Sequence, residues 1–318
     1  MLKDREMTEF LIGAGGWGYF HVPRLNSLEA YARAFNFVEV NSTFYNIPSL
    51  QLVKSWKKRV PENFEFSVRC HRDLTHKYKL DPIREVFNTF ETMKDIADIL
   101  NSRFLVLETP SYIDFSNEKI ESIKEFFGSL NLKGTRIVWE VRRRSKPIPP
   151  RLVALMQESN IIHCVDLSKE EPIVDSDTVY TRVFGKGEHN LYQFTDEEIM
   201  EIDERIARRT PETAVVSYHN VKMYKDAARY KIYRETGKFP AVTMAKGQQS
   251  LREVLIEDAA FPATKQELVK RQGWKVIDLT EERRVHAYTL LERLPDKQYG
   301  SVEEVLNSLP RAYSSIMR

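Results

Sequence analysis

Eight short runs of apolar and β-branched residues recur along the chain, and stretches with helical spacing separate most of them. The strand-like runs are residues 10–14, 37–41, 64–69, 104–108, 136–142, 161–166, 179–184 and 214–220, and the helical stretches include 28–35, 83–100, 119–130, 196–208 and 225–237. Strands that alternate with helices predict a parallel sheet, because parallel neighbours need a crossover connection. Eight such units predict an α/β fold, a (β/α)8 TIM-type barrel. The rival is an open, doubly wound sheet, but no glycine-rich phosphate fingerprint follows the first run.

The alternation of strand-like runs and helical stretches stops near Ser250. Thr264 with Glu267, and Ser301 with Glu304, have the spacing of helix capping boxes, as do Thr195 and Glu198 earlier in the chain. These patterns predict two domains: a barrel over residues 8–245 and a small helical C-terminal appendage over residues 250–318.

The composition is that of a globular protein. Hydrophobic residues make up 42% and charged residues 30% of the 318, and the formal net charge of +2 is too small to indicate a nucleic-acid binder by itself. No apolar run approaches the ~20 residues of a membrane span, so we expect no membrane contact. The charged start of the chain has no signal-peptide pattern. Cys70 and Cys164 lie within strand-like runs, which predicts buried thiols and a cytoplasmic location.

Polar side chains follow most of the apolar runs, where a barrel builds its active site. A glycine turn leads into Trp17, whose flat ring could stack on a ligand, as could that of Tyr45. The candidates for acid–base catalysis are Glu39, Glu140 and Asp166, and those for substrate binding are Trp17, Asn41, Tyr45, Arg69, His76, Arg142, Arg182, His219 and Asn220. His163 shares a strand face with Ile161 and Val165, which favours core packing.

The joint pattern is more informative than any single residue. Inward glutamates and arginines cost several kcal/mol when buried without a partner, so Glu140 and Arg142 need compensation. Mutual ion pairs are one possibility and a polar ligand is another, and the two can coexist. Glutamates whose pKa values are separated by neighbouring arginines suit general acid–base catalysis, and guanidinium groups suit carboxylate or phosphate oxygens.

No cofactor is assigned by the sequence, and the metal ligands remain unknown. A divalent metal is one possibility, with Glu39, Glu108, Glu140, Asp166 and His219 as the oxygen and imidazole donors. The interleaved arginines and the lack of a histidine or cysteine cluster favour an anion site instead. The basic run of residues 142–146 is most simply a solvated loop, but it could also collect a phosphate backbone.

These strand ends resemble the YecE-like family, domain of unknown function family 72. The resemblance runs from about Ile12 to Ala228. It rests on Gly16-Trp17, residues 38–45, Phe66-Ser67-Val68-Arg69 with Thr75-His76, Glu108-Thr109-Pro110, Trp139-Glu140-Val141-Arg142, Val165-Asp166, Tyr180-Thr181-Arg182 with Gly185, and Tyr218-His219-Asn220. The family implies a TIM-type barrel and no established reaction. Separately, residues 261–265, 291–295 and 299–305 resemble a small helical domain family, also of unknown function.

The chain departs from the family pattern at several positions. The resemblance implies Thr-Ser at Ala14-Gly15, Lys at Arg69, Gln at Glu108, His at Phe184 and Phe-Asn-Asn at residues 218–220, and a tryptophan after the Glu-x-Arg motif is missing. The pattern is kept at Glu39, Asn41, Glu140, Arg142, Asp166, Arg182 and Asn220.

Three functions are compatible with these observations. The leading hypothesis is an enzyme that binds an anionic, phosphate-bearing substrate at the carboxyl ends of the strands. In it, Glu39 and Glu140 (or Asp166) handle protons, Arg142 and Arg182 hold the anion, and the reaction is phosphoester hydrolysis, with nucleic acid as one candidate substrate. The second is a non-catalytic module that binds a small ligand or nucleic acid, with the C-terminal segment recruiting a protein partner. The third is a metal-dependent sugar isomerase or lyase.

Overall fold

The computed structural model describes residues 8–143 and 147–310 of the chain. The chain divides into two compact units, and each is described by itself. The first comprises Met1–Val183, Asp203–His219 and Met223–Ala228, and the second comprises Phe184–Ile202, Asn220–Lys222 and Arg229–Arg318.

Eight parallel strands form one sheet in the first unit. They are β1 (Glu9–Ala14), β2 (Phe37–Val40), β3 (Glu65–Arg69), β4 (Phe104–Thr109), β5 (Arg136–Val141), β6 (Ile162–Cys164), β7 (Thr178–Val183) and β8 (Thr213–Tyr218). Their order is β6-β5-β4-β3-β2-β1-β8-β7. A single parallel bridge, Val165 with Thr181, joins the two ends, so the sheet is nearly closed as a barrel. The predicted α/β barrel fold is confirmed.

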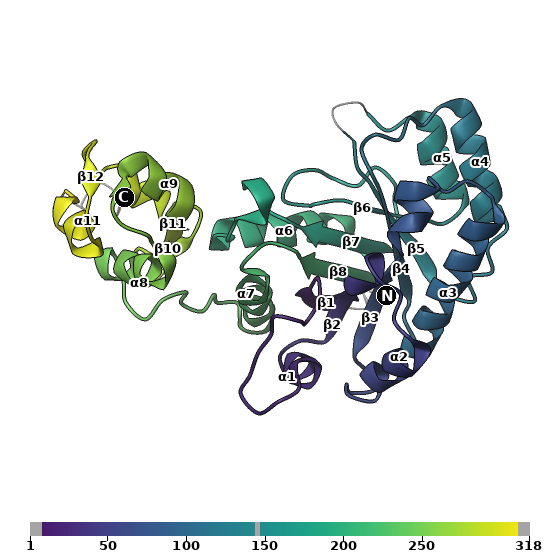
Figure 1. Ribbon diagram of the computed structural model, residues 1–318, viewed down its shortest axis with the longest axis horizontal. Coiled ribbons are helices and arrows are strands. Elements are labelled where there is room, and N and C mark those ends of the chain that lie inside the picture. The colour runs from purple at the N-terminus through teal and green to yellow at the C-terminus, as the bar shows by residue number, and fades with distance from the viewer. Residues whose placement is uncertain (1–7, 144–146, 311–318) are drawn as a thin grey trace, which may run out of the picture. The chain divides into compact units, whose positions relative to one another are not determined.

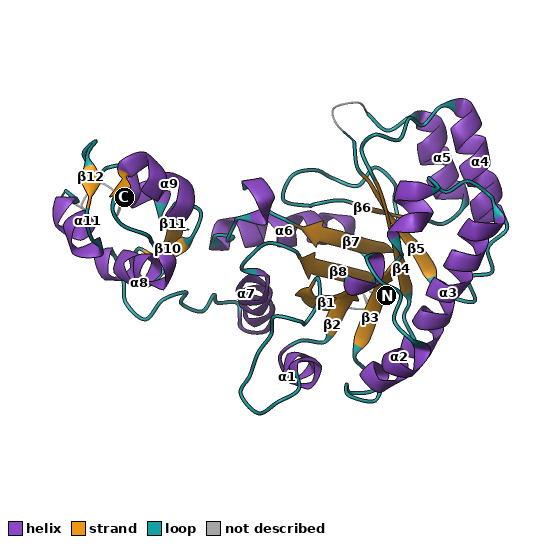
Figure 2. Cartoon of the chain, viewed as in Figure 1, coloured by secondary structure: helices purple, strands orange, loops and turns teal. Residues whose placement is uncertain are grey.

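Helices follow most of these strands (Figures 1 and 2). They are α1 (Ser27–Ala34), α2 (Leu50–Lys57), α3 (Arg84–Leu100), α4 (Asn117–Gly128), α5 (Pro150–Glu158), α6 (Asp196–Arg209) and α7 (Met223–Thr236). Short helical turns η1 (Ser42–Phe44), η2 (Asp73–Lys77) and η3 (Glu188–Asn190) follow β2, β3 and β7. The connection from β6 to β7 is described throughout, and it contains no helix.

The barrel interior places a charged layer directly above an apolar one. Leu11, Phe37, Phe104, Val106, Val138, Ile162, Cys164, Tyr180 and Val215 form a buried cluster inside the barrel. Side chains two positions apart on a strand point the same way, so the residue two places after an inward one also faces inward. Phe37, Val106, Val138 and Tyr180 are in this way followed by Glu39, Glu108, Glu140 and Arg182. The local sequence pattern thus builds a ring of charges at the carboxyl ends of the strands.

All eight predicted strands agree with the structure to within two residues at each end, and β6 is the shortest of them. The expected run of residues 161–166 contributes only Ile162–Cys164 to the ladder. The Asp166 carboxylate accepts hydrogen bonds from the Ser168 amide and hydroxyl, at 3.0 and 2.6 Å, and so turns the chain out of the sheet.

The second unit has its own core. Its remaining elements are α8 (Gln248–Asp258), β9 (Ala263–Thr264), α9 (Lys265–Gln272), β10 (Val276–Asp278), β11 (Arg284–His286), α10 (Tyr288–Leu291), β12 (Gln298–Tyr299) and α11 (Val302–Ser308). A buried cluster that includes Leu251, Leu255, Leu268, Leu291 and Tyr299 holds them together. Two two-stranded ladders, β10 with β11 and β9 with β12, accompany the helices and were not part of the helical prediction.

The three predicted caps start helices as expected, with one difference. Thr264 and Glu267 form a complete capping box, and the Thr195–Glu198 pair makes both reciprocal hydrogen bonds. The Ser301 hydroxyl accepts from the Glu304 amide, but the Glu304 carboxylate accepts from the Gly300 amide rather than from Ser301. Within the described residues, we find no helix long and apolar enough to cross a membrane.

Candidate functional site

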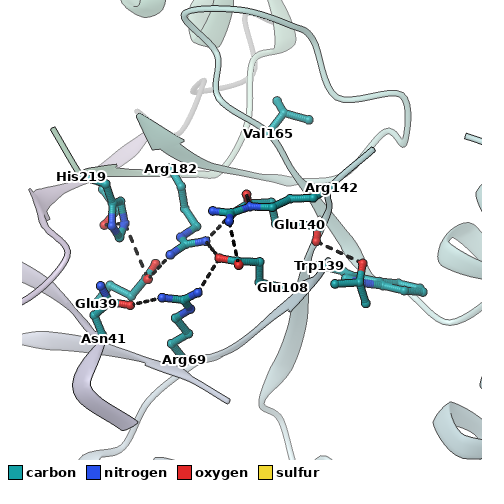
Figure 3. Close-up of polar contacts among 12 residues, drawn as sticks. Glu39, Asn41, Arg69, Glu108, Trp139, Glu140, Arg142, Val165, Arg182 and His219 are labelled. Atoms are coloured by element: carbon teal, nitrogen blue, oxygen red, sulfur yellow. Dashed lines mark hydrogen bonds and ion pairs between the residues drawn. The ribbon is translucent and has the colours of Figure 1, made fainter. Parts of the chain in front are cut away.

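Arg182 on β7 is the centre of the charged layer (Figure 3). Its side chain is 1% exposed, and its guanidinium contacts carboxylates from three other strands. Nη2 lies 3.1 Å from Glu39 Oε1, Nη1 lies 2.8 Å from Glu108 Oε2, and Nη1 also donates to Glu140 Oε2. One guanidinium therefore ties β2, β4 and β5 to β7 across the barrel.

Glu108 joins two more arginines to this centre. Arg69 Nη2 lies 2.6 Å from Glu108 Oε2, and Arg142 Nη1 lies 3.0 Å from Glu108 Oε1. Arg142 also donates from Nε to Glu140 Oε1 at 2.8 Å. Three carboxylates and three guanidinium groups thus share one network, and their formal charges balance.

Glu39 occupies the most enclosed position of the network. Its carboxylate is fully buried, Oε2 accepts from the Tyr180 hydroxyl at 3.0 Å, and Oε1 lies 3.6 Å from His219 Nε2. Its described contacts are all with other side chains, those of Arg182, Tyr180 and His219.

The electrostatics of the layer favour ionised carboxylates. Burial alone would raise the pKa of Glu39, but attraction by Arg182 and His219 holds that pKa well below its ordinary value. Burial also opposes ionisation of Glu140, and Arg182 and Arg142 outweigh it, so its pKa is lowered too. The same carboxylates raise the pKa of Arg182 in spite of its burial. Burial lowers the pKa of His219, although the nearby Glu39 carboxylate opposes this shift.

The donor set does not fit a divalent metal in this arrangement. Within the described residues, we find no group of three His, Cys, Asp or Glu side chains placed to hold one ion. The carboxylates that a metal would need contact guanidinium groups instead. A cation at this position would face three arginines.

An uncharged hollow of about 590 Å³ lies beside the layer. Its lining residues are Gly15, Gly16, Trp17, Gly18, Tyr19, Asn41, Ser42, Tyr45, Met223 and Tyr224. The Trp17 ring makes T-shaped contacts with Trp56 and with buried Phe66, with centroids 5.2 and 6.4 Å apart, and these two rings hold it in position. Asn41 connects this hollow to the charged layer, because its Oδ1 accepts from Arg69 Nη1 at 2.5 Å.

A second hollow, of about 530 Å³, is lined by residues 111–115, 141–143 and 147–149. Arg142 lies at its edge, and its side chain is 45% exposed. His76 lies near the arginines, packed against the Phe44 ring that also stacks beneath the Arg69 guanidinium, 3.7 Å from its centroid. Burial lowers the pKa of His76.

Two predicted residues make their described contacts away from this network. Asp166 accepts hydrogen bonds from Ser168 in its own loop and lies 3.2 Å from Lys169 Nζ. Asn220 belongs to the second unit, where its amide donates to the Tyr192 carbonyl at 2.8 Å. In the basic run of residues 142–146, Arg143 pairs with Glu170, and residues 144–146 lie outside the described residues.

The network depends on two further residues: the sequence pattern indicated Glu108 only as a possible metal donor, and it did not indicate Tyr180 as a site residue. Glu108 contacts all three arginines, and Tyr180 links Glu39 to Ser67, whose hydroxyl lies 2.6 Å from that of Tyr180. The signal for Glu108 was present, since Phe104, Val106 and Glu108 alternate inward on one strand and Glu108 pairs with Glu140 in register. Buried His163 accepts from the Ile173 amide at 3.1 Å and lies in the core, as the strand pattern indicated.

The sequence profile described as "Protein of unknown function DUF72" matches residues 11–234. The UPF0759 protein YunF of Bacillus subtilis strain 168 is 26% identical over 186 residues, which are 54% of this chain and 64% of YunF. YecE of Escherichia coli K12 is 29% identical over 122 residues, which are 37% of this chain and 43% of YecE. The chain thus spans less than two thirds of the length of these curated relatives.

Two solved structures share the fold. DUF72 family proteins from Enterococcus faecalis V583 and Thermotoga maritima MSB8 superpose with TM-scores of 0.58 and 0.57, at 18% and 20% identity. The superpositions cover 73% and 71% of this chain and 99% of each of those chains. At that identity the likeness concerns the fold alone.

Proposed function

The chain belongs to the DUF72 family, and from that starting point we propose that its barrel is an enzyme that binds an anionic, phosphate-bearing substrate at the carboxyl ends of the strands. The observation that carries the proposal is the position of Arg142. Its guanidinium is held by Glu108 and Glu140, whose side chains are 2% and 13% exposed, yet its own side chain is 45% exposed at the edge of a hollow. An arginine fixed on buried carboxylates and open to solvent is preorganised to bind a phosphate group.

Phosphoester hydrolysis is the reaction that we propose to test first. Arg142 would bind the phosphate oxygens. The ionised Glu140 would accept a proton from a water molecule while the oxygen of that water attacks phosphorus. The ester bond breaks, and the leaving oxygen keeps the electron pair and takes a proton from solvent. When the anion draws Arg142 away from Glu140, the pKa of that carboxyl rises, which makes it a better base. Glu39 and Arg182 are positioning residues in this scheme.

The test is a screen of phosphomonoesters, phosphodiesters and short nucleic acids, each with and without added divalent metal. We expect Glu140→Gln to lower kcat by about 10²–10⁴-fold, as loss of a general base does. Arg142→Gln should raise KM by about tenfold or more through loss of a charged hydrogen bond. The control is Arg151→Gln, because Arg151 pairs with Glu121 on the surface, where both side chains are more than half exposed. Absence of any turnover above that of Glu140→Gln would refute the enzymatic proposal.

A second candidate is a non-catalytic binding module. It is favoured by the pKa values of Glu39 and Glu140, which are both lowered, so that neither carboxyl holds a proton near neutral pH. A network without a protonated acid suits capture of an anion better than protonation of a leaving group. Thermal stabilisation by a phosphoester that is not turned over would support this candidate over the first.

Two further sequence expectations remain proposals. We propose that the segment beyond Ser250 recruits a protein partner, which its separate core in the second unit makes feasible. We also propose a cytoplasmic location, which the buried free thiols of Cys70 and Cys164 support.

A further inference from the structure

We propose that the uncharged hollow beside the charged layer binds a planar heteroaromatic ring that carries a hydrogen-bond acceptor, as nucleobases do. The proposal deepens the proposed function, on which it rests for the phosphate-bearing part of the substrate, and it names the chemical class of the remainder.

The lining selects an apolar, flat group. Its side chains include Trp17, Tyr19, Tyr45 and Tyr224, and none of its ten lining residues carries a formal charge at neutral pH. Tyr45 is 57% and Tyr19 is 83% exposed, so their rings are accessible to a ligand. Aromatic faces of this kind stack on flat rings without strong preference for one base.

Asn41 supplies hydrogen-bond donors to the hollow. An arginine side chain has no hydrogen-bond acceptor, so the Asn41 atom that faces Arg69 Nη1 must be the amide oxygen. The amide nitrogen is thereby turned away from Arg69, and within the described residues we find no other hydrogen bond of this side chain. Asn41 therefore offers two N–H donors to a molecule in the hollow that it lines, and a ring nitrogen or exocyclic carbonyl oxygen fits them.

A pyranose would fit this lining poorly. Almost every carbon of such a ring bears a hydroxyl group, and each buried hydroxyl needs a partner. Besides the tyrosine hydroxyls and the Trp17 indole N–H, the polar side chains in this lining are Asn41 and Ser42. The Tyr224 hydroxyl already donates to the Gly16 carbonyl at 3.1 Å.

The same contacts connect the hollow to Arg142. Asn41 contacts Arg69, Arg69 contacts Glu108, and Glu108 contacts Arg142 at the edge of the second hollow. One chain of polar contacts thus joins the ring site to the proposed phosphate site.

The experiment uses uncharged ligands, so that it is independent of phosphate binding. Adenosine, guanosine, cytidine and uridine are titrated into the full chain by calorimetry and by tryptophan fluorescence, with methyl glucoside as the pyranose probe. We expect at least one nucleoside to bind and to quench Trp17 fluorescence, and methyl glucoside to show no binding. Trp17→Leu and Asn41→Asp should each weaken nucleoside binding about tenfold or more.

Asn41→Asp is the most specific test of the proposed N–H donors. It keeps an oxygen for Arg69 and replaces the two N–H donors with an acceptor, so the fold is retained while the ring loses its partner. The matched control is Asn88→Asp, which makes the same change at an exposed position of α3. The proposal is overturned if no nucleoside binds at millimolar concentration, if methyl glucoside binds as tightly, or if Asn41→Asp binds nucleosides as the unmodified chain does. Failure here with successful phosphoester turnover would leave the proposed function standing.

Discussion

Arg182 shows at the scale of one residue how the barrel tolerates charge in its interior. Its guanidinium contacts Glu39, Glu108 and Glu140, and all four side chains are largely shielded from water. Buried ion pairs add little net stability, but removal of one partner leaves the others uncompensated and costs a great deal.

We therefore predict that Arg182→Met lowers the free energy of unfolding by about 3–5 kcal/mol. Urea denaturation followed by circular dichroism measures it. Arg151→Met, which breaks the exposed pair with Glu121, serves as the control and should cost less than about 1 kcal/mol. A loss below about 1 kcal/mol in Arg182→Met would mean that the charged layer is not held as described.

His163 makes stability depend on pH. Burial lowers the pKa of this side chain from 6.5 to about 4, with Arg143 and Arg209 adding to the effect. Above pH 6.5 neither the folded nor the unfolded chain is protonated at His163. As the pH falls from 6.5 towards 4, the unfolded chain takes up the proton first, so folding stability is lost over that window.

The matched variant is His163→Asn, which keeps an acceptor for the Ile173 amide and cannot titrate there. We predict that the unmodified chain loses about 3 kcal/mol more stability than the variant between pH 6.5 and 4. Denaturant unfolding at a series of pH values gives the difference. Parallel stability curves for the two proteins would contradict the assignment.

Residue by residue, the sequence predicted the inward charges because alternation along a strand needs no tertiary information. Glu140 and Arg182 follow buried residues at a spacing of two, which places them in the barrel interior. Asp166 was expected in the same set, but alternation fails once a strand ends. The Asp-Leu-Ser sequence after Val165 is typical of a side-chain-capped turn and could have indicated this.

Among the elements, the junction between β6 and β7 has the least backbone pairing. A single bridge, Val165 with Thr181, closes the barrel there. The Thr181 hydroxyl adds two contacts: it donates to the Val165 carbonyl at 2.8 Å and accepts from the Leu167 amide at 3.0 Å. One side chain thus substitutes for ladder hydrogen bonds that β6 is too short to make.

Thr181→Val tests this junction with little change in volume. It leaves the buried Leu167 amide without its partner, and we predict a loss of about 1–3 kcal/mol. Thr213→Val on β8 is the control, since that hydroxyl makes a long 3.4 Å contact to the partly exposed Glu9. Hydrogen exchange should show faster opening of β6 and β7 in the Thr181 variant. Equal stability of the two variants would show that the Thr181 hydroxyl does not stabilise the junction between β6 and β7.

Element bounds follow from local signals where caps and breakers are present. Gly237 in the left-handed conformation ends α7, and Thr264 with Glu267 begins α9, at positions that the sequence marked. The ladders β10–β11 and β9–β12 escaped prediction because they consist of only two or three residues per strand, too few for a periodic pattern.

On the scale of the whole molecule, the chain has two cores that we expect to respond separately. Leu291 lies in the core of the second unit, where it is inaccessible to solvent. Leu291→Ala should cost about 2–5 kcal/mol through the cavity that it leaves. Hydrogen exchange with mass spectrometry should show faster exchange in residues 248–309 and unchanged protection in strands β2–β5. Equal acceleration in both units would show that they unfold as one.

The fold could be predicted from the sequence, whereas the substrate could not, for a physical reason. Eight strand–helix repeats restrict the topology strongly, but the chemistry depends on which charges neutralise one another once they meet. Only the structure shows that the Glu108 carboxylate forms ion pairs with all three arginines. It also shows that Arg142 alone among these arginines reaches an open surface.

In the proposed function, this surface at the barrel's carboxyl end binds an oxyanion through Arg142. The most direct measurement is an anomalous difference map from a crystal of the full chain soaked in tungstate, a phosphate analogue with a strong signal. We expect a tungsten peak within hydrogen-bonding range of the Arg142 guanidinium that is absent from a crystal of Arg142→Gln. A map with no peak at the mouth of the barrel, or with the same peak in both crystals, would contradict it.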